Sequence, residues 1–158
     1  MGRFSGFCIT FLVVLIPSSL QAATPKSVRL QTEDHSLVVI RGRAVCLDSS
    51  GREADSLFGC SDTGKTFGFV SKDGKLYKFL PTDTMTPVFS DVRVRQRDLQ
   101  LSARLHPGDR LEIIKVQSVK EGKVYDIFYY CDVCSITAYI PGPCPCCGKD
   151  LEFREKLQ

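Results

Sequence analysis

Two cysteine pairs near the C-terminus are the residues of this sequence whose type and spacing best suit metal binding. Cys131 and Cys134 form one C-x-x-C pair, and Cys144 and Cys147 form a second pair after nine intervening residues. Zinc prefers a tetrahedron of soft donors, and thiolates bind it at about 2.3 Å. Because each tight turn aims its two sulfurs the same way, the spacing predicts that these four cysteines bind one zinc ion.

The residues around the second pair suit a tight metal-binding turn. Gly148 follows Cys147 and permits the positive φ that such a turn requires. The segment Pro141-Gly142-Pro143 reverses the chain between the two pairs. Only one residue separates Cys146 from Cys144, which is too close for both sulfurs to join one tetrahedron without strain. We therefore expect Cys146 to be excluded from the ligand set.

The cysteine-rich tail resembles the zinc ribbon of the heavy-metal-binding domain family over about 25 residues. The matching residues are Tyr130, Cys131, Cys134, Pro141, Gly142, Cys144, Pro145, Cys147, Gly148 and Leu151. The resemblance implies an exported protein of the kind involved in metal resistance or efflux. The sequence has Val133, Cys134 and Lys149 where the family has a Met-His pair and a Met. Losing these methionines disfavours copper or silver, whereas four thiolates favour zinc.

Two other uses of the paired cysteines remain open from the sequence. In an oxidising compartment Cys131 could pair with Cys134, and Cys144 with Cys147, as disulfides. The Cys131/Cys134 pair could also serve as a thiol-disulfide oxidoreductase motif. That reading lacks the strand-then-helix context that a thioredoxin-like motif needs.

The N-terminus has the three-part pattern of a secretory signal peptide. A short segment with Arg3 precedes an uncharged apolar run over residues 7–16, and the small residues Ala22 and Ala23 follow. The run is about half the roughly 20 residues needed to span a bilayer. We predict a signal peptide over residues 1–23, a polar leader over 24–36, and a periplasmic or secreted protein with no stable membrane span after cleavage.

Removal of that segment leaves seven of the eight cysteines, because Cys8 is lost with it. Cys46 and Cys60 are fourteen positions apart and flank a loop rich in Ser, Gly and Asp. In an oxidising compartment we expect them to form a disulfide, worth about 3 kcal/mol by loop-entropy arithmetic. Four cysteines for a metal and two for this bridge leave Cys146 as the odd thiol.

The elements that must position these cysteines read as short strands. Apolar and β-branched runs alternate with Gly, Asp and Pro turns, and no stretch shows sustained helical periodicity. The predicted strands cover residues 37–46, 66–70, 76–80, 99–103, 111–119 and 123–130. Asp73-Gly74 predicts a tight hairpin between the second and third of these strands. Gly42 predicts a bulge or bend within the first.

This pattern predicts an all-β fold, a small barrel or sandwich over residues 37–130, followed by a zinc ribbon over residues 128–155. The strand order is weakly similar to that of an oligonucleotide/oligosaccharide-binding (OB) barrel, a likeness at the level of fold that implies no function. The composition is ordinary for a globular protein, with 43% hydrophobic and 25% charged residues. The net charge of +3 is too small to indicate a polyanionic partner.

Several local motifs have simpler explanations than function. Residues 59–66 match a phosphate-binding loop letter for letter, but the sequence predicts a strand after them where that motif needs a helix. Arg93, Arg95 and Arg97 alternate and are predicted to lie on one face of an extended, solvated edge. His35 and His106 are isolated surface histidines. We place no catalytic residue and no site for an organic cofactor.

These features favour an exported, non-enzymatic zinc protein whose barrel offers an interaction surface to a protein partner in the cell envelope. Nucleic acid is not expected as a partner. The alternative functions are capture or relay of copper or zinc in the envelope and, further, thiol-disulfide exchange through Cys131 and Cys134.

The signal-like N-terminus leads to a direct test. Because the apolar run ends before Ala22 and Ala23, secreted protein should begin at Ala23 or Thr24. Intact-mass measurement of material from the culture medium or periplasm gives the answer. A mass that includes residues 1–22 would contradict this prediction.

Overall fold

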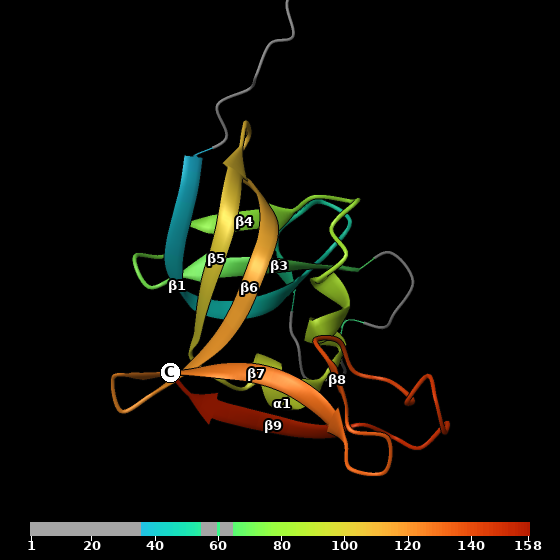
Figure 1. The fold of residues 1–158 in the computed structure, drawn as a ribbon. Coiled ribbons are helices and arrows are strands. Elements are labelled where there is room, and N and C mark those ends of the chain that lie inside the picture. Colours follow the sequence, from blue (N-terminus) through green and yellow to red (C-terminus); the bar gives the residue numbers. More distant parts are fainter. Residues whose placement is uncertain (1–35, 55–59, 61–64) are drawn as a thin grey trace, which may run out of the picture. The chain divides into compact units, whose positions relative to one another are not determined.

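The computed structural model describes residues 36–54, 60 and 65–158, and these form an all-β fold (Figure 1), as predicted. The predicted signal peptide and nearly all of the predicted leader lie outside the described residues. The strands in the described part are β1 (Ser36–Leu47), β2 (Glu53–Ala54), β3 (Thr66–Ser71), β4 (Leu76–Phe79), β5 (Leu99–His106), β6 (Arg110–Lys120), β7 (Lys123–Cys131), β8 (Ile136–Ala138) and β9 (Glu152–Leu157). A 3-10 helix, η1 (Thr86–Ser90), and a short α-helix, α1 (Val92–Arg95), connect β4 to β5.

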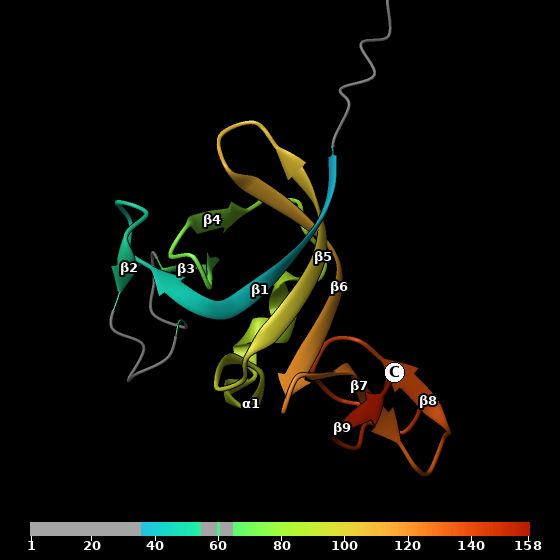
Figure 2. The same cartoon turned by 90° about the vertical axis from the view of Figure 1, so that its left-hand side faces the viewer.

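Five strands form a closed ring. Going round the ring, β1 pairs with β3, β3 with β4, β4 with β6, β6 with β5, and β5 again with β1. All of these pairs are antiparallel except β4 with β6. The prediction was a small OB-like barrel or sandwich, and this five-strand ring accounts for the strands predicted between residues 37 and 119. Figures 1 and 2 show β7, β8 and β9 together at one end of the ring.

The bend predicted in β1 occurs at Gly42. The first half of β1 pairs with β5 and the second half pairs with β3, and Gly42 takes part in both pairings. A Cβ atom at this position would collide with the carbonyl oxygen of Val70, so only glycine lets the two backbones approach this closely. Before the bend, Leu37 and Val39 point outward and are 72% and 66% exposed.

The predicted hairpin between β3 and β4 is also present. The backbone N–H of Gly74 donates to the carbonyl of Ser71 at 2.9 Å, and Gly74 has a φ of 84°. This left-handed conformation is the one that Asp-Gly turns favour. The register pairs Phe69 with Tyr77, which places Phe69 in the centre of the core, where it is fully buried.

The arginine-rich segment is helical, so the prediction of an extended, solvated edge was wrong. The side chain of Asp91 accepts a hydrogen bond from the backbone N–H of Arg93 at 2.8 Å and so caps the first turn of α1. Helical spacing brings Arg93 and Arg97 to the same side, where both guanidinium groups lie within 5 Å of the Phe153 ring centroid. The helix has only four residues, too few to create a visible helical period in the sequence.

The C-terminal strands form an extension built on β7. Its first residues pair with β6 and its last three residues pair with β8, whereas β9 pairs with Tyr125 to Tyr130. The strands β8 and β9 were not predicted. Tyr129 of β7 is fully buried in a hydrophobic cluster that also includes residues of the ring. Apolar packing therefore runs without interruption from the ring into the extension.

The hydroxyl of Tyr129 joins the extension to α1. It donates to the carboxylate of Asp91 at 2.9 Å, and Asp91 also binds Arg93 at 2.7 Å. Burial raises the pKa of Tyr129, and the hydrogen bond to Asp91 raises it further. Burial alone would raise the pKa of Asp91, but the bonds from Arg93 and Tyr129 outweigh it and the pKa is lowered. This pair therefore consists of a neutral phenol and an ionised carboxylate.

A second carboxylate, that of Glu155, ties β9 to the ring. It accepts hydrogen bonds from Arg97 at 2.8 Å, Ser118 at 2.5 Å and Lys120 at 2.6 Å. The Glu155 side chain is only 10% exposed. Burial works against its ionisation, but the three donors outweigh burial and lower its pKa to about 2.

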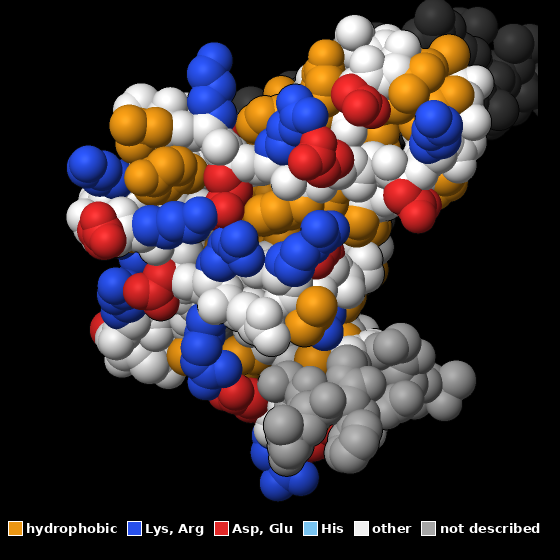
Figure 3. Space-filling model, turned by 90° about the horizontal axis from the view of Figure 1, so that it is seen from below, with side chains coloured by type: hydrophobic (Ala, Val, Ile, Leu, Met, Phe, Trp, Pro, Cys, Tyr) orange, Lys and Arg blue, Asp and Glu red, His pale blue; other side chains and the backbone are white. Residues whose placement is uncertain are grey.

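The surface seen from below the ring carries charges of both signs. Figure 3 shows Lys and Arg side chains interspersed with acidic and hydrophobic ones on this face. The arginines of the α1 segment contribute to carboxylate pairs, as Arg93 does with Asp91 and Arg97 with Glu155. Their charge is therefore largely compensated within the fold.

The second half of β1 carries the predicted disulfide. Cys46 and Cys60 are bonded, which ties Cys60 to β1. Both residues are buried. Among the described residues, no helix combines the length and the apolar character needed to cross a membrane.

The Glu155 carboxylate should make stability sensitive to acid. Its pKa in the folded protein is about 2, below the ordinary 4.5, so its stabilising effect is complete above about pH 4.5 and is lost as the pH falls towards 2. We expect Glu155→Gln to lower the free energy of unfolding by about 2 kcal/mol at neutral pH and by much less near pH 3.

Urea unfolding at several pH values measures this difference. Glu152→Gln is the matched control, because Glu152 lies on the same strand and its side chain is 65% exposed. Both variants keep all the cysteines, so acid effects on the thiols cancel in the comparison. A Glu155→Gln deficit that stayed constant from pH 7 to pH 3 would contradict the assignment.

Candidate metal centre

The first cysteine pair lies where β7 turns into β8. Cys131 is the last residue of β7, Cys134 follows in the turn, and β8 begins at Ile136. Between them Ser135 has a φ of 55°, the left-handed conformation that non-glycine residues seldom adopt. This turn directs the thiols of Cys131 and Cys134 to the same side.

The second pair lies in the loop between β8 and β9. The backbone N–H of Cys144 donates to the carbonyl of Lys149 at 2.7 Å, and the N–H of Gly148 donates to the carbonyl of Cys144 at 2.8 Å. Gly148 has a φ of 71°, as expected from the sequence. Pro143 and Asp150 form an isolated β-bridge that closes the base of the loop.

The two turns are built alike. In each, a residue with positive φ directly follows the second cysteine, namely Ser135 in the first turn and Gly148 in the second. In each, the sulfur of the first cysteine also accepts hydrogen bonds from backbone N–H groups two and three residues later. These donors are Val133 and Cys134 for Cys131, and Cys146 and Cys147 for Cys144. Such donors stabilise negative charge on sulfur, which a metal-bound thiolate carries.

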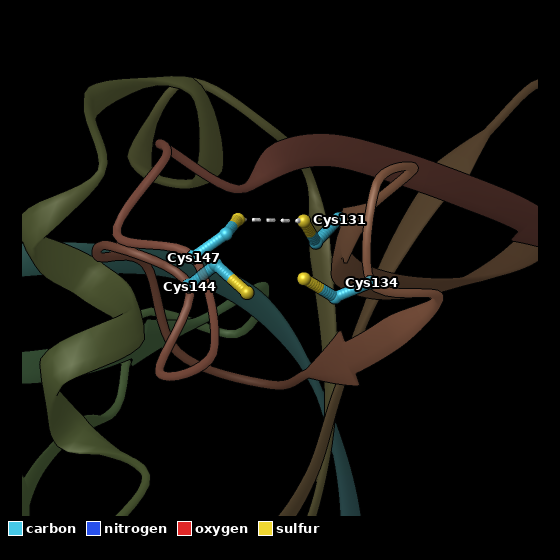
Figure 4. A group of neighbouring side chains, drawn as sticks. All are labelled: Cys131, Cys134, Cys144 and Cys147. Atoms are coloured by element: carbon cyan, nitrogen blue, oxygen red, sulfur yellow. Dashed lines mark hydrogen bonds between the residues drawn. The ribbon is translucent and has the colours of Figure 1, made fainter.

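The four sulfurs converge on one point. All four Sγ atoms lie within 4.8 Å of one another, and the Sγ atoms of Cys131 and Cys147 are 3.6 Å apart. A tetrahedron with metal–sulfur bonds of about 2.3 Å separates its sulfurs by about 3.8 Å. Figure 4 shows the pair from β7 and the pair from the later loop facing each other across the centre. The arrangement fits a single tetrahedral metal ion.

The ligands differ in burial, so the centre has an inner and an outer side. Cys131 and Cys144 are each only 2% exposed and belong to the same hydrophobic cluster as the ring. Cys134 is half-buried, and Cys147 is exposed. A metal ion bound here would be held from the core by two sulfurs and would face solvent through the other two.

Cys146 lies outside the four-sulfur group, in agreement with the sequence prediction. It is exposed, and the group of side chains able to hold a metal ion does not include it. Its proximity raises the pKa of Cys134. Cys146 therefore borders the centre without completing it.

The thiol pKa values show how the cysteines influence one another. The backbone N–H of Cys147 lowers the pKa of Cys144, and with the other hydrogen bonds this brings it to about 7. The N–H of Cys134 lowers the pKa of Cys131, but burial and the neighbouring thiols Cys144 and Cys147 outweigh it, so that pKa is raised. Hydrogen bonds from Cys146 and Cys147 raise the pKa of Cys134. The raised pKa values of Cys131 and Cys134 mean that these two thiols do not readily ionise without a cation beside them.

The other sequence candidates lie apart from this group. His106 ends β5, and its Nε2 atom is 3.1 Å from a carboxylate oxygen of Glu112. Thr66, the last residue of the phosphate-loop motif, begins strand β3, so the motif is followed by a strand as expected. Most of that motif and His35 lie outside the described residues.

Comparison with known proteins finds no matching family model, no similar curated protein and no matching solved structure. The resemblance of the tail to heavy-metal-binding domains therefore stays a prediction. What the chain can do has to be argued from the geometry of the four cysteines and from the surface of the fold.

Some residues that shape the centre were not identified from the sequence. Ser135 was missed because a serine does not signal positive φ as a glycine does. The backbone donors Val133 and Cys146 were missed because their contribution does not depend on side-chain type. The equal spacing of the two cysteine pairs could have revealed Ser135. If the two turns are alike, the residue after Cys134 must adopt the same positive φ as Gly148.

The paired turns lead to a prediction about backbone strain. A Cβ atom at Gly148 would meet no other atom within 4 Å, so Gly148→Ala changes only the cost of a positive φ. That cost is about 1 kcal/mol, or about a fivefold loss of metal affinity. Ser135→Gly should relieve the same strain and keep or improve affinity.

Titration with Co²⁺, followed by its thiolate charge-transfer absorption, reports these affinities. Gly74→Ala is the matched control, because Gly74 has a φ of 84° and open space around it but lies in the β3–β4 hairpin. It should lower stability without changing the Co²⁺ affinity. Unchanged affinity in Gly148→Ala would show that the second turn does not need its left-handed residue.

Proposed function

We propose that this chain is an exported, non-enzymatic protein in which Cys131, Cys134, Cys144 and Cys147 bind one structural zinc ion. The observation that carries this proposal is the convergence of four sulfurs within 4.8 Å of one another, with two of them buried in the core of the fold. Zinc suits a site of four thiolates and no other donor. The twin turns with their N–H donors support the same choice.

The structural role follows from where the ligands lie. Cys131 ends β7, whereas Cys144 belongs to the loop that leads into β9, so an ion between them fixes that loop against the strand. The loop buries little apolar surface of its own, because Tyr139 and Ile140 are exposed and only Cys144 and Leu151 are buried. Binding of zinc to thiolate sites in small peptides is worth on the order of 10 kcal/mol near neutral pH. The ion would therefore supply most of the folding energy of this loop.

Export is part of the proposal. The signal-like N-terminus motivates it, and the disulfide between Cys46 and Cys60 is compatible with an oxidising compartment. In this setting the five-strand ring would present a surface to a protein partner in the cell envelope. The exposed apolar side chains Leu37 and Val39 on β1 are one part of that surface.

Capture or relay of metal in the envelope is the second candidate function. The observation that favours it is the exposure of Cys147, which leaves one side of the centre open to an incoming chelator or partner. A structural zinc should resist mild chelation for hours, whereas relayed metal should leave within minutes. The third reading, thiol-disulfide exchange, is less favoured because the pKa of Cys131 is raised rather than lowered.

Matched cysteine variants test the ligand assignment. Protein purified from its native compartment should contain one zinc per chain by elemental analysis. Cys144→Ser should lose the zinc, because it removes a buried ligand, whereas Cys146→Ser should retain it. Hydrogen exchange should then show loss of protection over residues 131–151 in Cys144→Ser, with the ring strands still protected.

Two results would contradict the assignment. Equal loss of zinc from both variants, or full retention by Cys144→Ser, would mean that the ligands are other than those proposed. Copper in place of zinc in native material, released rapidly to a chelator, would favour the relay function.

A further inference from the structure

The first half of β1 has one edge without a partner strand. Residues 36–42 pair with β5 on one side, whereas β3 joins the other side of β1 only from Gly42 onward. Among the strands that the structure describes, none pairs with that other side between Ser36 and Arg41. Figure 1 shows this half of β1 at the margin of the ring, beside β5. An unpaired edge of this kind is able to accept another strand.

The backbone polar groups of Leu37 and Val39 point towards this open edge. The carbonyl of Arg41 accepts a hydrogen bond from the backbone N–H of Lys72 at 2.8 Å, on the side where β3 lies. In an antiparallel strand both backbone groups of a residue point to one side, and successive residues alternate between the two sides. Leu37 and Val39 therefore direct their N–H and C=O groups to the same side as Arg41, where no described strand meets them.

The side chains along this edge are apolar and exposed. Leu37 and Val39, at 72% and 66%, are the most exposed large hydrophobic residues of the part of the chain that the structure describes. Charged side chains and prolines commonly protect an edge strand from pairing, but the sequence has neither between Ser36 and Ile40. By contrast, four of the six residues of β9, which pairs only with β7, are charged. The first half of β1 therefore lacks the usual protection.

We propose that two copies of this chain associate by pairing their β1 edges antiparallel, about a two-fold axis that passes between the two Val38 residues. Leu37 of one copy then lies opposite Val39 of the other, and each of these two pairs exchanges two backbone hydrogen bonds. The exposed side chains of each pair contact one another on the outer face, as in the self-complementary interface of a symmetric dimer. The proposal assigns this part of the interaction surface put forward above to a second copy, and it does not depend on the metal.

The edge suits its own copy because it is neutral and its polar groups match one another. No side chain from Ser36 to Ile40 is charged, so the two edges approach without like-charge repulsion. The register pairs residues 36–40 of each copy with one another, all within β1. A partner strand shifted further towards Arg41 would meet the β3–β4 hairpin, because Lys72 already binds that carbonyl. The hairpin therefore limits the register on one side.

The edge is short, so the association is weak. Five residues from each copy supply four backbone hydrogen bonds and two leucine–valine contacts, a smaller interface than the roughly 1,200–2,000 Å² that stable complexes bury. We expect a dissociation constant of roughly 0.1–1 mM. The dimer then becomes the main species only at high protein concentration, which makes the concentration dependence the property to measure.

Amide exchange at two protein concentrations tests the pairing residue by residue. Mature, metal-loaded protein labelled with ¹⁵N is compared at about 20 µM and about 2 mM, since mass action raises the dimer fraction between them. Exchange of the Leu37 and Val39 amides should slow about two- to fivefold at the higher concentration. The amides of Val38 and Ile40 point towards β5 and should be protected equally at both concentrations.

A matched pair of lysine variants localises the interface. Val39→Lys places a charge on both facing edges, and sedimentation equilibrium should find it monomeric at about 2 mM. Leu157→Lys is the control, because Leu157 lies on β9 and is 52% exposed. It should dimerise as the wild type does. Metal content is measured in every sample, so an error in the ligand assignment would not be mistaken for a failure of this proposal.

Three results would overturn the proposal. Equal protection of the Leu37 and Val39 amides at both concentrations would mean that a segment of the same chain occupies the edge. Equally fast exchange of both amides at the two concentrations would mean that the edge does not pair with its own copy. Dimerisation of Val39→Lys as readily as the wild type would place the interface elsewhere.

Discussion

The carboxylate of Glu155 is the contact on which the arrangement of the C-terminal half depends. It receives hydrogen bonds from Arg97, which follows α1, and from Ser118 and Lys120 of β6, and so fixes β9 against the ring. The loop that carries Cys144 and Cys147 lies between β8 and β9 and therefore has one end anchored by this carboxylate. The proposed metal would anchor the middle of the same loop to Cys131. The charge network and the proposed coordination bonds would thus hold one segment at two different points.

The shared strand β7 explains why the ring and the extension do not behave as separate pieces of structure. Its first half continues the pairing of the ring, and its last residue is a ligand candidate. Tyr129, between these two parts, is buried and hydrogen-bonded to Asp91. Movement of β7 at the cysteine centre would therefore disturb the packing of α1. Only a short distance along one strand separates the cysteine centre from the core of the ring.

Local signals were enough to predict the strands of the ring, the β3–β4 hairpin, the bend at Gly42 and the grouping of four cysteines. Each of these features depends on residues that are close in sequence. The strands follow from alternating apolar and polar residues, the hairpin from Asp-Gly, the bend from a glycine within a strand, and the cysteine grouping from the two-residue gap within each pair. The helix α1 and the strand β9 were missed because distant partners stabilise them. Arg93 of α1 and Phe153 of β9 are 60 positions apart in sequence, yet the guanidinium group of Arg93 lies over the Phe153 ring and joins the two elements. No pattern within either segment reveals the other.

The chain combines two states of cysteine that require opposite conditions. Cys46 and Cys60 are joined as a disulfide, whereas the centre proposed to bind zinc needs four thiolates. If the chain is exported as proposed, oxidising catalysts of that compartment would act on its accessible thiols, and its maturation would need a fixed order. The proposed ion would have to arrive before an oxidant reaches Cys134 or Cys147, the two candidate ligands nearest solvent. Supply of metal during secretion would then decide how much of the newly made protein matures and how much is trapped in mispaired forms.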